Sequence, residues 1–205
     1  MNSRYNSEWI NNLESELHWR YYWQQQNLIQ QYLEKEDKIL EIGIGTKFTS
    51  NYLKSKGFNI TTIDIDKNKS PDIVADISNY KFKNKYDHIL AFEIFEHMPF
   101  DDFLKSIENL SGICKKNLFI SLPRNEKVWL RISLDFKIFK ISNFQISTIR
   151  NKILSKYHFW EIDYKKEYKK RMIISQFEKY GFKVIKTKKF YSLYYFAFEN
   201  TKNIS

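Results

Sequence analysis

Apolar residues recur along the chain with two different periods, and these periods predict where helices and strands lie. The segment 7–33 has apolar residues at helical spacing, and Ser7 at its start is a residue type that caps helices. Short apolar runs predict buried strands at 38–44, 60–65, 73–75, 88–92 and 117–122. Helical spacing returns between them at 47–56 and 101–110. Strands and helices that alternate through short connections are typical of a doubly wound α/β fold with a parallel sheet.

The last part of the chain has a different order of elements. A helix is predicted over 165–180 and ends at Gly181, and two strands follow at 182–190 and 193–198. Because almost no residues separate these strands, we expect them to pair as an antiparallel β-hairpin. The complete prediction is a doubly wound, mostly parallel seven-stranded sheet that ends in a C-terminal antiparallel β-hairpin.

Length and composition favour one cytoplasmic domain. The chain has 205 residues, of which 42% are hydrophobic, so a sizeable core can form. It contains no apolar run long enough to span a membrane, and its first residues lack the apolar segment of a signal peptide. Cys114, the single cysteine, forms neither an internal disulfide nor a cysteine metal cluster. A reducing cytoplasm is therefore the expected location.

Charge is unevenly distributed between the two parts of the chain. Residues 1–122 contain 15 basic and 17 acidic residues, whereas residues 123–205 contain 19 basic and 7 acidic residues. The net charge is therefore −2 in the first part and +12 in the second. Such an excess suggests a phosphorylated substrate, a nucleic acid or an anionic membrane surface as partner, unless the lysines only form a solvated surface.

The loop after the first predicted strand contains the clearest chemical signal. Gly43 and Gly45 carry no Cβ, so the backbone can turn sharply there and approach a ligand closely. Asp64 ends the second strand, where its carboxylate can accept hydrogen bonds from two ribose hydroxyls. Phe48 stands where a dinucleotide fingerprint has its third glycine, and Glu41 repels phosphate. An adenosine with a positively charged tail fits this loop better than a dinucleotide does.

With these motifs the chain resembles class I S-adenosylmethionine-dependent methyltransferases over nearly its whole length after residue 15. The resemblance is carried by the glycine loop, by the segments 87–100 and 117–123, and by the C-terminal segment 158–187. A departure is Lys47, where the family commonly has glycine. The resemblance implies S-adenosyl-L-methionine as cofactor. It implies ten cofactor contacts, at Glu41, Gly43, Ile44, Gly45, Asp64, Ile65, Asp76, Ile77, Phe92 and Glu93.

The turn after the fourth strand contains candidate catalytic residues. If it is helical, Glu93, Glu96 and His97 share one face, because positions three and four apart are neighbours on a helix. His97 could take a proton from an acceptor hydroxyl, with Glu96 orienting it and His158 as a further candidate. The structural interpretation is that Glu96 and His97 only cap and pack a helix.

The same spacing also resembles the metal-binding turn of small-RNA 3′-end 2′-O-methyltransferases, which add a later histidine. His158 could be that histidine, and two carboxylates with two imidazoles would suit a divalent metal. Because Glu-x-x-Glu-His also occurs in metal-free relatives, we expect no metal ligands. A metal-dependent RNA 2′-O-methyltransferase and a non-catalytic S-adenosylmethionine-binding protein remain alternatives.

Motifs that the sequence lacks narrow the acceptor. No Asn- or Asp-Pro-Pro-aromatic segment follows the fourth strand, which disfavours the exocyclic amino groups of nucleobases, and Cys114 lacks the preceding proline of cytosine-C5 enzymes. An oxygen acceptor remains. Only 6 of the 34 basic residues are arginine, the residue that makes most bidentate contacts to phosphates and bases, so a nucleic acid is the less favoured partner. We expect a small molecule, a sugar, or a phosphate-bearing or lipid-linked glycan as acceptor, with peripheral membrane contact possible.

The resemblance divides the single domain, residues 1–205, into four parts. These are an N-terminal helical segment at 1–35, a cofactor-binding half at 36–122, a basic and aromatic insertion at 123–157, and a C-terminal helix with its hairpin at 158–198. Apolar residues alternate from Val128 to Ile138, so the insertion could form strands or an amphipathic helix. It could serve as a substrate lid, as a membrane-surface segment or as ordinary packing.

Overall fold

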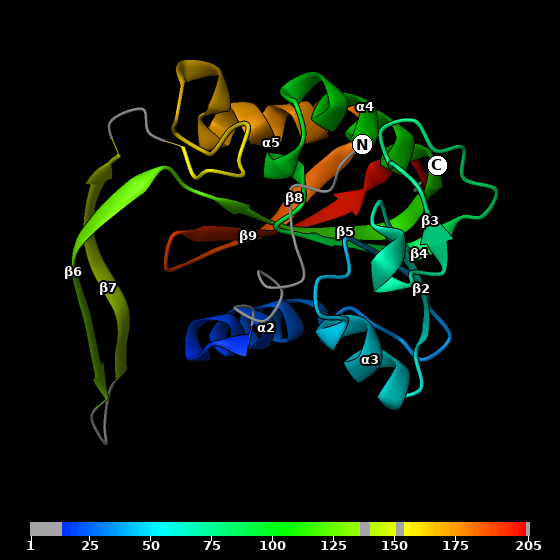
Figure 1. Cartoon of the computed structure of the whole chain (residues 1–205), viewed down its shortest axis with the longest axis horizontal. Coiled ribbons are helices and arrows are strands. Elements are labelled where there is room, and N and C mark those ends of the chain that lie inside the picture. The colour runs from blue at the N-terminus through cyan, green and yellow to red at the C-terminus, as the bar shows by residue number, and fades with distance from the viewer. Residues whose placement is uncertain (1–13, 136–139, 151–153, 204–205) are drawn as a thin grey trace.

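A computed structural model describes residues 14–135, 140–150 and 154–203 of the chain. It confirms the predicted seven-stranded sheet, whose strand order is β3-β2-β1-β4-β5-β9-β8 (Figure 1). The parallel strands are β1 (Lys38–Ile42), β2 (Asn59–Asp64), β3 (Ile73–Val74), β4 (Tyr86–Phe92) and β5 (Cys114–Pro123). The closing hairpin consists of β8 (Phe182–Phe190) and β9 (Leu193–Asn200), and β9 runs antiparallel to β5.

Helices cover both faces of this sheet. Helices α2 (Glu16–Ile29) and α3 (Phe48–Ser55) lie on one face, and α4 (Phe100–Ile113) and α5 (Lys170–Lys179) lie on the other (Figure 1). Short 3-10 helices occupy four connections, at Lys67–Lys69, Phe95–His97, Lys166–Tyr168 and Thr201–Asn203. The carboxyl ends of the parallel strands therefore open between the two helical layers, which is where such folds bind ligands.

The first helix is shorter than the spacing predicts. The predicted start at Ser7 lies outside the described residues, and α2 ends at Ile29 rather than at Leu33. After Ile29 the chain turns, and Tyr32 and Leu33 pack against the core from that turn. Their apolar spacing reflects this burial and not a continued helix.

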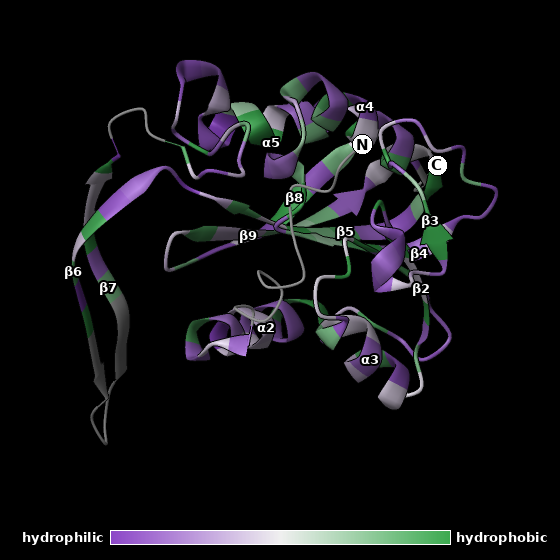
Figure 2. Ribbon diagram, in the orientation of Figure 1, coloured by the Kyte–Doolittle hydropathy of each residue, from purple (hydrophilic) through white to green (hydrophobic). Residues whose placement is uncertain are grey.

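Two apolar clusters fill the space on either side of the sheet. The strands β1, β4 and β5 contribute fully buried residues to both clusters, which explains why apolar residues stand at consecutive positions in them, as at Ile39–Leu40, Ile89–Ala91 and Leu118–Ile120. Hydrophilic residues are frequent on the helices and connecting turns (Figure 2). Among the described helices, none combines the length and apolar character that crossing a bilayer requires.

Within its described residues, 123–135, 140–150 and 154–157, the insertion contains strands and not a helix. Strands β6 (Glu126–Asp135) and β7 (Lys140–Ile149) pair antiparallel as a two-stranded ribbon that extends away from the main sheet (Figure 1). About midway along β6, the Arg131 guanidinium lies 3.5 Å from the centre of the Tyr191 ring. The two β-bulges in this pairing explain why the alternation of apolar residues was ambiguous. Its role as lid or membrane-surface segment stays a prediction.

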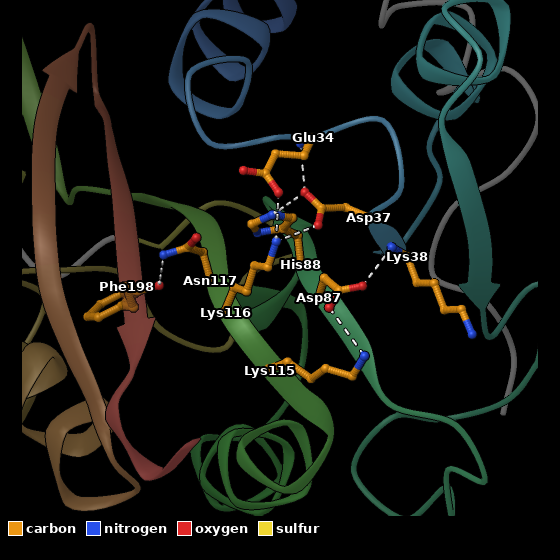
Figure 3. Close-up of polar contacts among 9 residues, drawn as sticks. All are labelled: Glu34, Asp37, Lys38, Asp87, His88, Lys115, Lys116, Asn117 and Phe198. Atoms are coloured by element: carbon orange, nitrogen blue, oxygen red, sulfur yellow. Dashed lines mark hydrogen bonds and ion pairs between the residues drawn. The ribbon is translucent and has the colours of Figure 1, made fainter. Parts of the chain in front are cut away.

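A buried polar cluster joins the strands at the edge opposite to their carboxyl ends (Figure 3). His88 is fully buried, and its Nε2 lies 2.9 Å from Asp37 Oδ2. The same carboxylate accepts a hydrogen bond of 2.7 Å from Lys116 Nζ and one of 2.6 Å from the Glu34 N–H. Asp37 therefore ties the loop before β1 to β4 and to the start of β5.

Candidate active site

The carboxyl ends of β1 and β4 border a cavity of about 170 Å³. Six of the ten predicted cofactor residues line it, namely Glu41, Gly43, Ile44, Gly45, Phe92 and Glu93. The two histidines His97 and His158 line it as well. The structure thus brings the glycine loop and the candidate catalytic turn to one cavity, although they lie about fifty residues apart in the sequence.

The glycine loop turns through backbone conformations that suit glycine. Gly43 has φ +70° and Gly45 has φ +48°, both in the left-handed region. A Cβ at Gly43 would lie 1.8 Å from Ile94 Cδ1, far inside van der Waals contact. A side chain at position 43 would therefore displace the turn that follows β4.

Lys47 departs from the family pattern in its side chain but not in its backbone. Its φ is +63°, so a lysine occupies the left-handed conformation that a glycine adopts without steric cost. We expect Lys47→Gly to raise the free energy of unfolding by about 1 kcal/mol, because relief of the strain exceeds the entropic cost of glycine. Urea denaturation measures this, with Lys105→Gly inside α4 as a control expected to lose about 1 kcal/mol. An unchanged or lower stability of Lys47→Gly would contradict the strain.

Asp64 supports the loop from the end of β2. Its side chain is almost fully buried and accepts hydrogen bonds from the N–H of Ile44 at 3.0 Å and of Asp66 at 2.9 Å. Lys69, which lines the cavity, donates to Asp64 Oδ2 at 2.9 Å. Because Lys69 lies against this carboxylate, Asp64 itself does not line the cavity described above.

The three other predicted cofactor residues also lie outside the cavity lining. Ile65 is half exposed, and Ile77 is buried in the core. Asp76 accepts hydrogen bonds from the Ser78 N–H at 2.9 Å and hydroxyl at 2.8 Å, which fixes the turn after β3. These residues follow β2 and β3, beyond Lys69 as seen from the glycine loop.

Helix α2 supplies lining residues that the motifs did not indicate. They are His18, Tyr21, Tyr22 and Gln25. Lys69, from the 3-10 helix after β2, also lines the cavity and was not indicated by the motifs. The four helical residues stand at positions i, i+3, i+4 and i+7, which is the spacing of one helix face. A polar and aromatic face at this spacing is the signal that could have found them.

Glu93 occupies a strained position at the end of β4. It has φ +55°, which costs a residue with a side chain about 1–3 kcal/mol and is typical of functional sites. Its N–H donates to the Ser121 carbonyl oxygen at 3.2 Å, which holds it beside β5. Burial raises the pKa of its carboxyl to about 7.

The turn after Glu93 is a 3-10 helix, Phe95–His97, so the α-helical turn on which a shared face of Glu93, Glu96 and His97 depended does not form. The positive φ at Glu93 changes the chain direction, so Glu93 does not continue into the helical turn of Glu96 and His97. Glu96 is buried at 1% exposure. Burial raises the pKa of Glu96 well above its usual range, and the nearby charge of Glu93 raises it further.

His158 joins this turn from sixty residues further along the chain. The Phe159 N–H donates to the Glu96 carbonyl oxygen at 2.8 Å, and the His97 and His158 rings lie 5.0 Å apart. Ligand atoms of Glu96, His97 and His158 all lie within 4.8 Å of one another. We call these three residues the histidine–glutamate cluster.

Comparison with known proteins agrees with this architecture. A family model described as a methyltransferase domain matches residues 17–187. Ribosomal RNA small subunit methyltransferase A of Mesomycoplasma hyopneumoniae (strain 232) is 33% identical over 111 residues, which are 54% of this chain and 34% of that protein. The chain therefore spans about a third of the length of this relative.

Solved structures of low sequence identity share the fold. N-methyltransferase NodS of Bradyrhizobium japonicum WM9, in complex with S-adenosyl-L-homocysteine, has a TM-score of 0.61 at 10% identity and covers 93% of this chain and 91% of its own. Magnesium protoporphyrin IX methyltransferase of Synechocystis PCC 6803, with bound S-adenosylmethionine, has a TM-score of 0.61 at 12% identity. The match covers 98% of this chain and 86% of that chain. Together with the family model, the sheet order and the cavity beside the glycine loop, they place this chain in the class I S-adenosylmethionine-dependent methyltransferase family.

Proposed function

We propose that this methyltransferase transfers its methyl group to an oxygen of a small-molecule, sugar or phosphate-bearing glycan acceptor. The observation that carries the proposal is that the histidine–glutamate cluster borders the same cavity as the glycine loop. Two imidazoles beside the methyl donor suit an acceptor whose hydroxyl proton has to be removed. An amine that is already neutral would need no such group.

The cofactor pose in this proposal follows the lining of the cavity. The methionine part lies along the backbone of Gly43 and Gly45. Glu41 Oε2 is buried without a hydrogen-bond partner among the described residues, and burial raises the pKa of Glu41 to about 8. A positive charge beside this carboxyl would lower that pKa and favour its charged form, so the positively charged part of the cofactor fits here. The ribose lies toward Asp64, where its hydroxyls take the place of the Lys69 ammonium, and the adenine lies toward Ile65 and Asp76.

The ribose contact gives a quantitative prediction. Asp64→Ala is expected to weaken S-adenosylhomocysteine binding by about 1–3 kcal/mol, because charge-assisted hydrogen bonds to the ribose are lost. Calorimetry measures the affinity, and Asp66→Ala is the control because the Asp66 side chain only accepts from the Asn68 N–H. Equal affinities of wild type and Asp64→Ala would remove the ribose assignment.

Catalysis in this proposal rests first on position. The reaction is an in-line displacement at a methyl group, so holding acceptor and cofactor together supplies much of the rate. His97 is the first candidate to receive the acceptor proton, and Glu96 and His158 complete the polar surroundings of that proton. Glu93, which precedes this turn in the chain, lines the same cavity, where we place the acceptor.

An RNA 2′-hydroxyl is the second candidate acceptor. It is favoured by the excess of basic residues in the part of the chain after residue 122 and by the relative that is named for ribosomal RNA. Binding to RNA phosphates would make activity fall steeply with salt, since bound counterions are released on association. A sugar acceptor without phosphate would show no such dependence.

Matched pairs of acceptors test the proposed function. S-adenosylhomocysteine release is measured with compounds that differ only in a hydroxyl or an amine, such as a sugar and its amino sugar, and with short RNA. We expect turnover with the hydroxyl member of a pair and an O-methylated product. Methylation of the amine members alone would contradict the proposal.

A further inference from the structure

We infer that the histidine–glutamate cluster binds a divalent transition-metal cation at the edge of the cofactor cavity. Glu96, His97 and His158 each offer one ligand atom, and these atoms lie within 4.8 Å of one another. Donors about 2.0–2.3 Å from one cation lie at most about 4.6 Å apart, so these separations are close to those that a shared cation requires. Binding of the cation stands on these residues alone, whereas its catalytic role rests on the proposed function.

Both imidazoles are held in the orientation that metal ligands need. His97 Nδ1 lies 3.1 Å from the Tyr157 carbonyl oxygen, and His158 Nδ1 lies 2.7 Å from Glu161 Oε1. A carbonyl oxygen and a carboxylate only accept hydrogen bonds, so the proton of each neutral ring belongs on Nδ1. The lone pair is then on Nε2, the nitrogen that can coordinate a metal. Metal-binding histidines generally donate their other N–H to such an acceptor.

Glu161 is itself fixed by its surroundings. It is 2% exposed and accepts hydrogen bonds from Asn125 Nδ2 at 2.7 Å, the Ser155 N–H at 3.1 Å and Arg150 Nη2 at 3.2 Å. Three donors other than His158 therefore hold the carboxylate that orients this histidine. Such extensive hydrogen bonding of the residue that orients the His158 ring is expected of a metal ligand and exceeds what packing of the ring requires.

Glu96 gives the independent observation that points to a cation. Its Oε2 is buried and has no hydrogen-bond partner among the described residues. A buried carboxylate oxygen without a partner is costly and rare. A cation between this carboxylate and the two Nε2 atoms would satisfy it.

The donor set selects the kind of cation. Two imidazole nitrogens and one carboxylate suit Zn²⁺, Mn²⁺ or Fe²⁺, whereas Mg²⁺ prefers oxygen ligands alone. Three protein ligands leave coordination positions open, as in catalytic metal sites. An acceptor with two neighbouring oxygens, such as a vicinal diol or a hydroxyl beside a phosphate, could occupy them. The cation would then polarise the acceptor hydroxyl, and His97 would act as its ligand instead of receiving the proton.

Direct binding tests the site without any acceptor. Metal-free full-length protein is titrated calorimetrically with Mn²⁺, Zn²⁺ and Mg²⁺ in the absence of cofactor. We expect one equivalent of Mn²⁺ or Zn²⁺ to bind more tightly than Mg²⁺, and His158→Ala to bind at least about 10-fold more weakly. Glu161→Gln is expected to weaken metal binding about 10–100-fold, because the His158 ring loses the carboxylate that orients it. His18→Ala is the control, because His18 lines the same cavity outside the cluster.

Three results would overturn the cation site or its role. Absence of Mn²⁺ and Zn²⁺ binding to wild type, or equal binding to a folded His158→Ala variant, would remove the site. Full methyl transfer by protein in EDTA would remove the catalytic role and leave the proposed function intact. Conversely, bound metal without transfer to any hydroxyl acceptor would support the site and contradict the proposed function.

Discussion

Replacement of His97 by alanine is expected to lower the turnover of methyl transfer by roughly 10²–10⁴-fold, the usual contribution of a group that assists proton removal. At about 1.36 kcal/mol per decade, this corresponds to a barrier that is about 3–5 kcal/mol higher. The same variant should bind S-adenosylhomocysteine nearly as well as wild type does. The distinction is expected because His97 borders the cavity from the turn after β4, whereas the proposed contacts to the methionine part of the cofactor are on the glycine loop.

Added imidazole provides a control for the His97 result. The alanine variant leaves a space of the size of the ring, and free imidazole that enters it should restore part of the turnover. Steady-state release of S-adenosylhomocysteine measures the rate, and calorimetry measures the affinity. If His97→Ala retains wild-type turnover, or loses cofactor affinity in proportion to its rate, His97 is a structural residue.

Replacement of Asp37 by alanine is expected to lower the free energy of unfolding by about 1.5–3 kcal/mol, the usual effect of removing hydrogen bonds to a charged group. The variant leaves fully buried His88 without its partner and removes the acceptor of Lys116 Nζ (Figure 3). Chemical denaturation measures the loss. Asp102→Ala is the matched control, because its ion pair with Lys105 is on the surface and is worth at most about 1 kcal/mol.

The pH dependence of stability checks the same cluster. Burial alone would raise the pKa of Asp37, but hydrogen bonds from Lys116 and the Glu34 N–H and the nearby His88 hold it below its ordinary value of 3.8. A lowered pKa stabilises the fold above the ordinary pKa, and this stability is lost as pH falls through the folded pKa. Wild type should therefore lose stability below about pH 4, and Asp37→Ala should lack this part of the loss. Identical acid profiles would contradict the assignment.

The sequence predicts most of the main sheet because its strands are buried on both faces. Runs such as Ile39–Ile42 and Leu118–Leu122 have no exposed side, so they are apolar except for Glu41 and Ser121, and their length identifies them. The ribbon of β6 and β7 lies outside this sheet and is interrupted by bulges, so its pattern fitted either a strand or a helix. Local periodicity therefore indicates elements well where burial is uniform.

The candidate site was predictable in part. Gly43 and Gly45 act through their own backbone, and their positive φ values agree with what the motif implied. The gathering of His158 with His97 depends on a tertiary contact between Phe159 and Glu96, which no local pattern contains. The shared helix face of Glu93, Glu96 and His97, which was conditional on a helical turn, does not form, because Glu93 has positive φ and precedes the 3-10 helix Phe95–His97.

A crystal structure of the protein with bound S-adenosylhomocysteine tests the central claim most directly. The claim is that the cofactor cavity and the histidine–glutamate cluster form one active site. We expect the ribose hydroxyls on Asp64 and the sulfur directed toward His97 and His158, with room for one acceptor oxygen between them. A cofactor whose sulfur points away from the cluster, or whose ribose lies far from Asp64, would contradict the account.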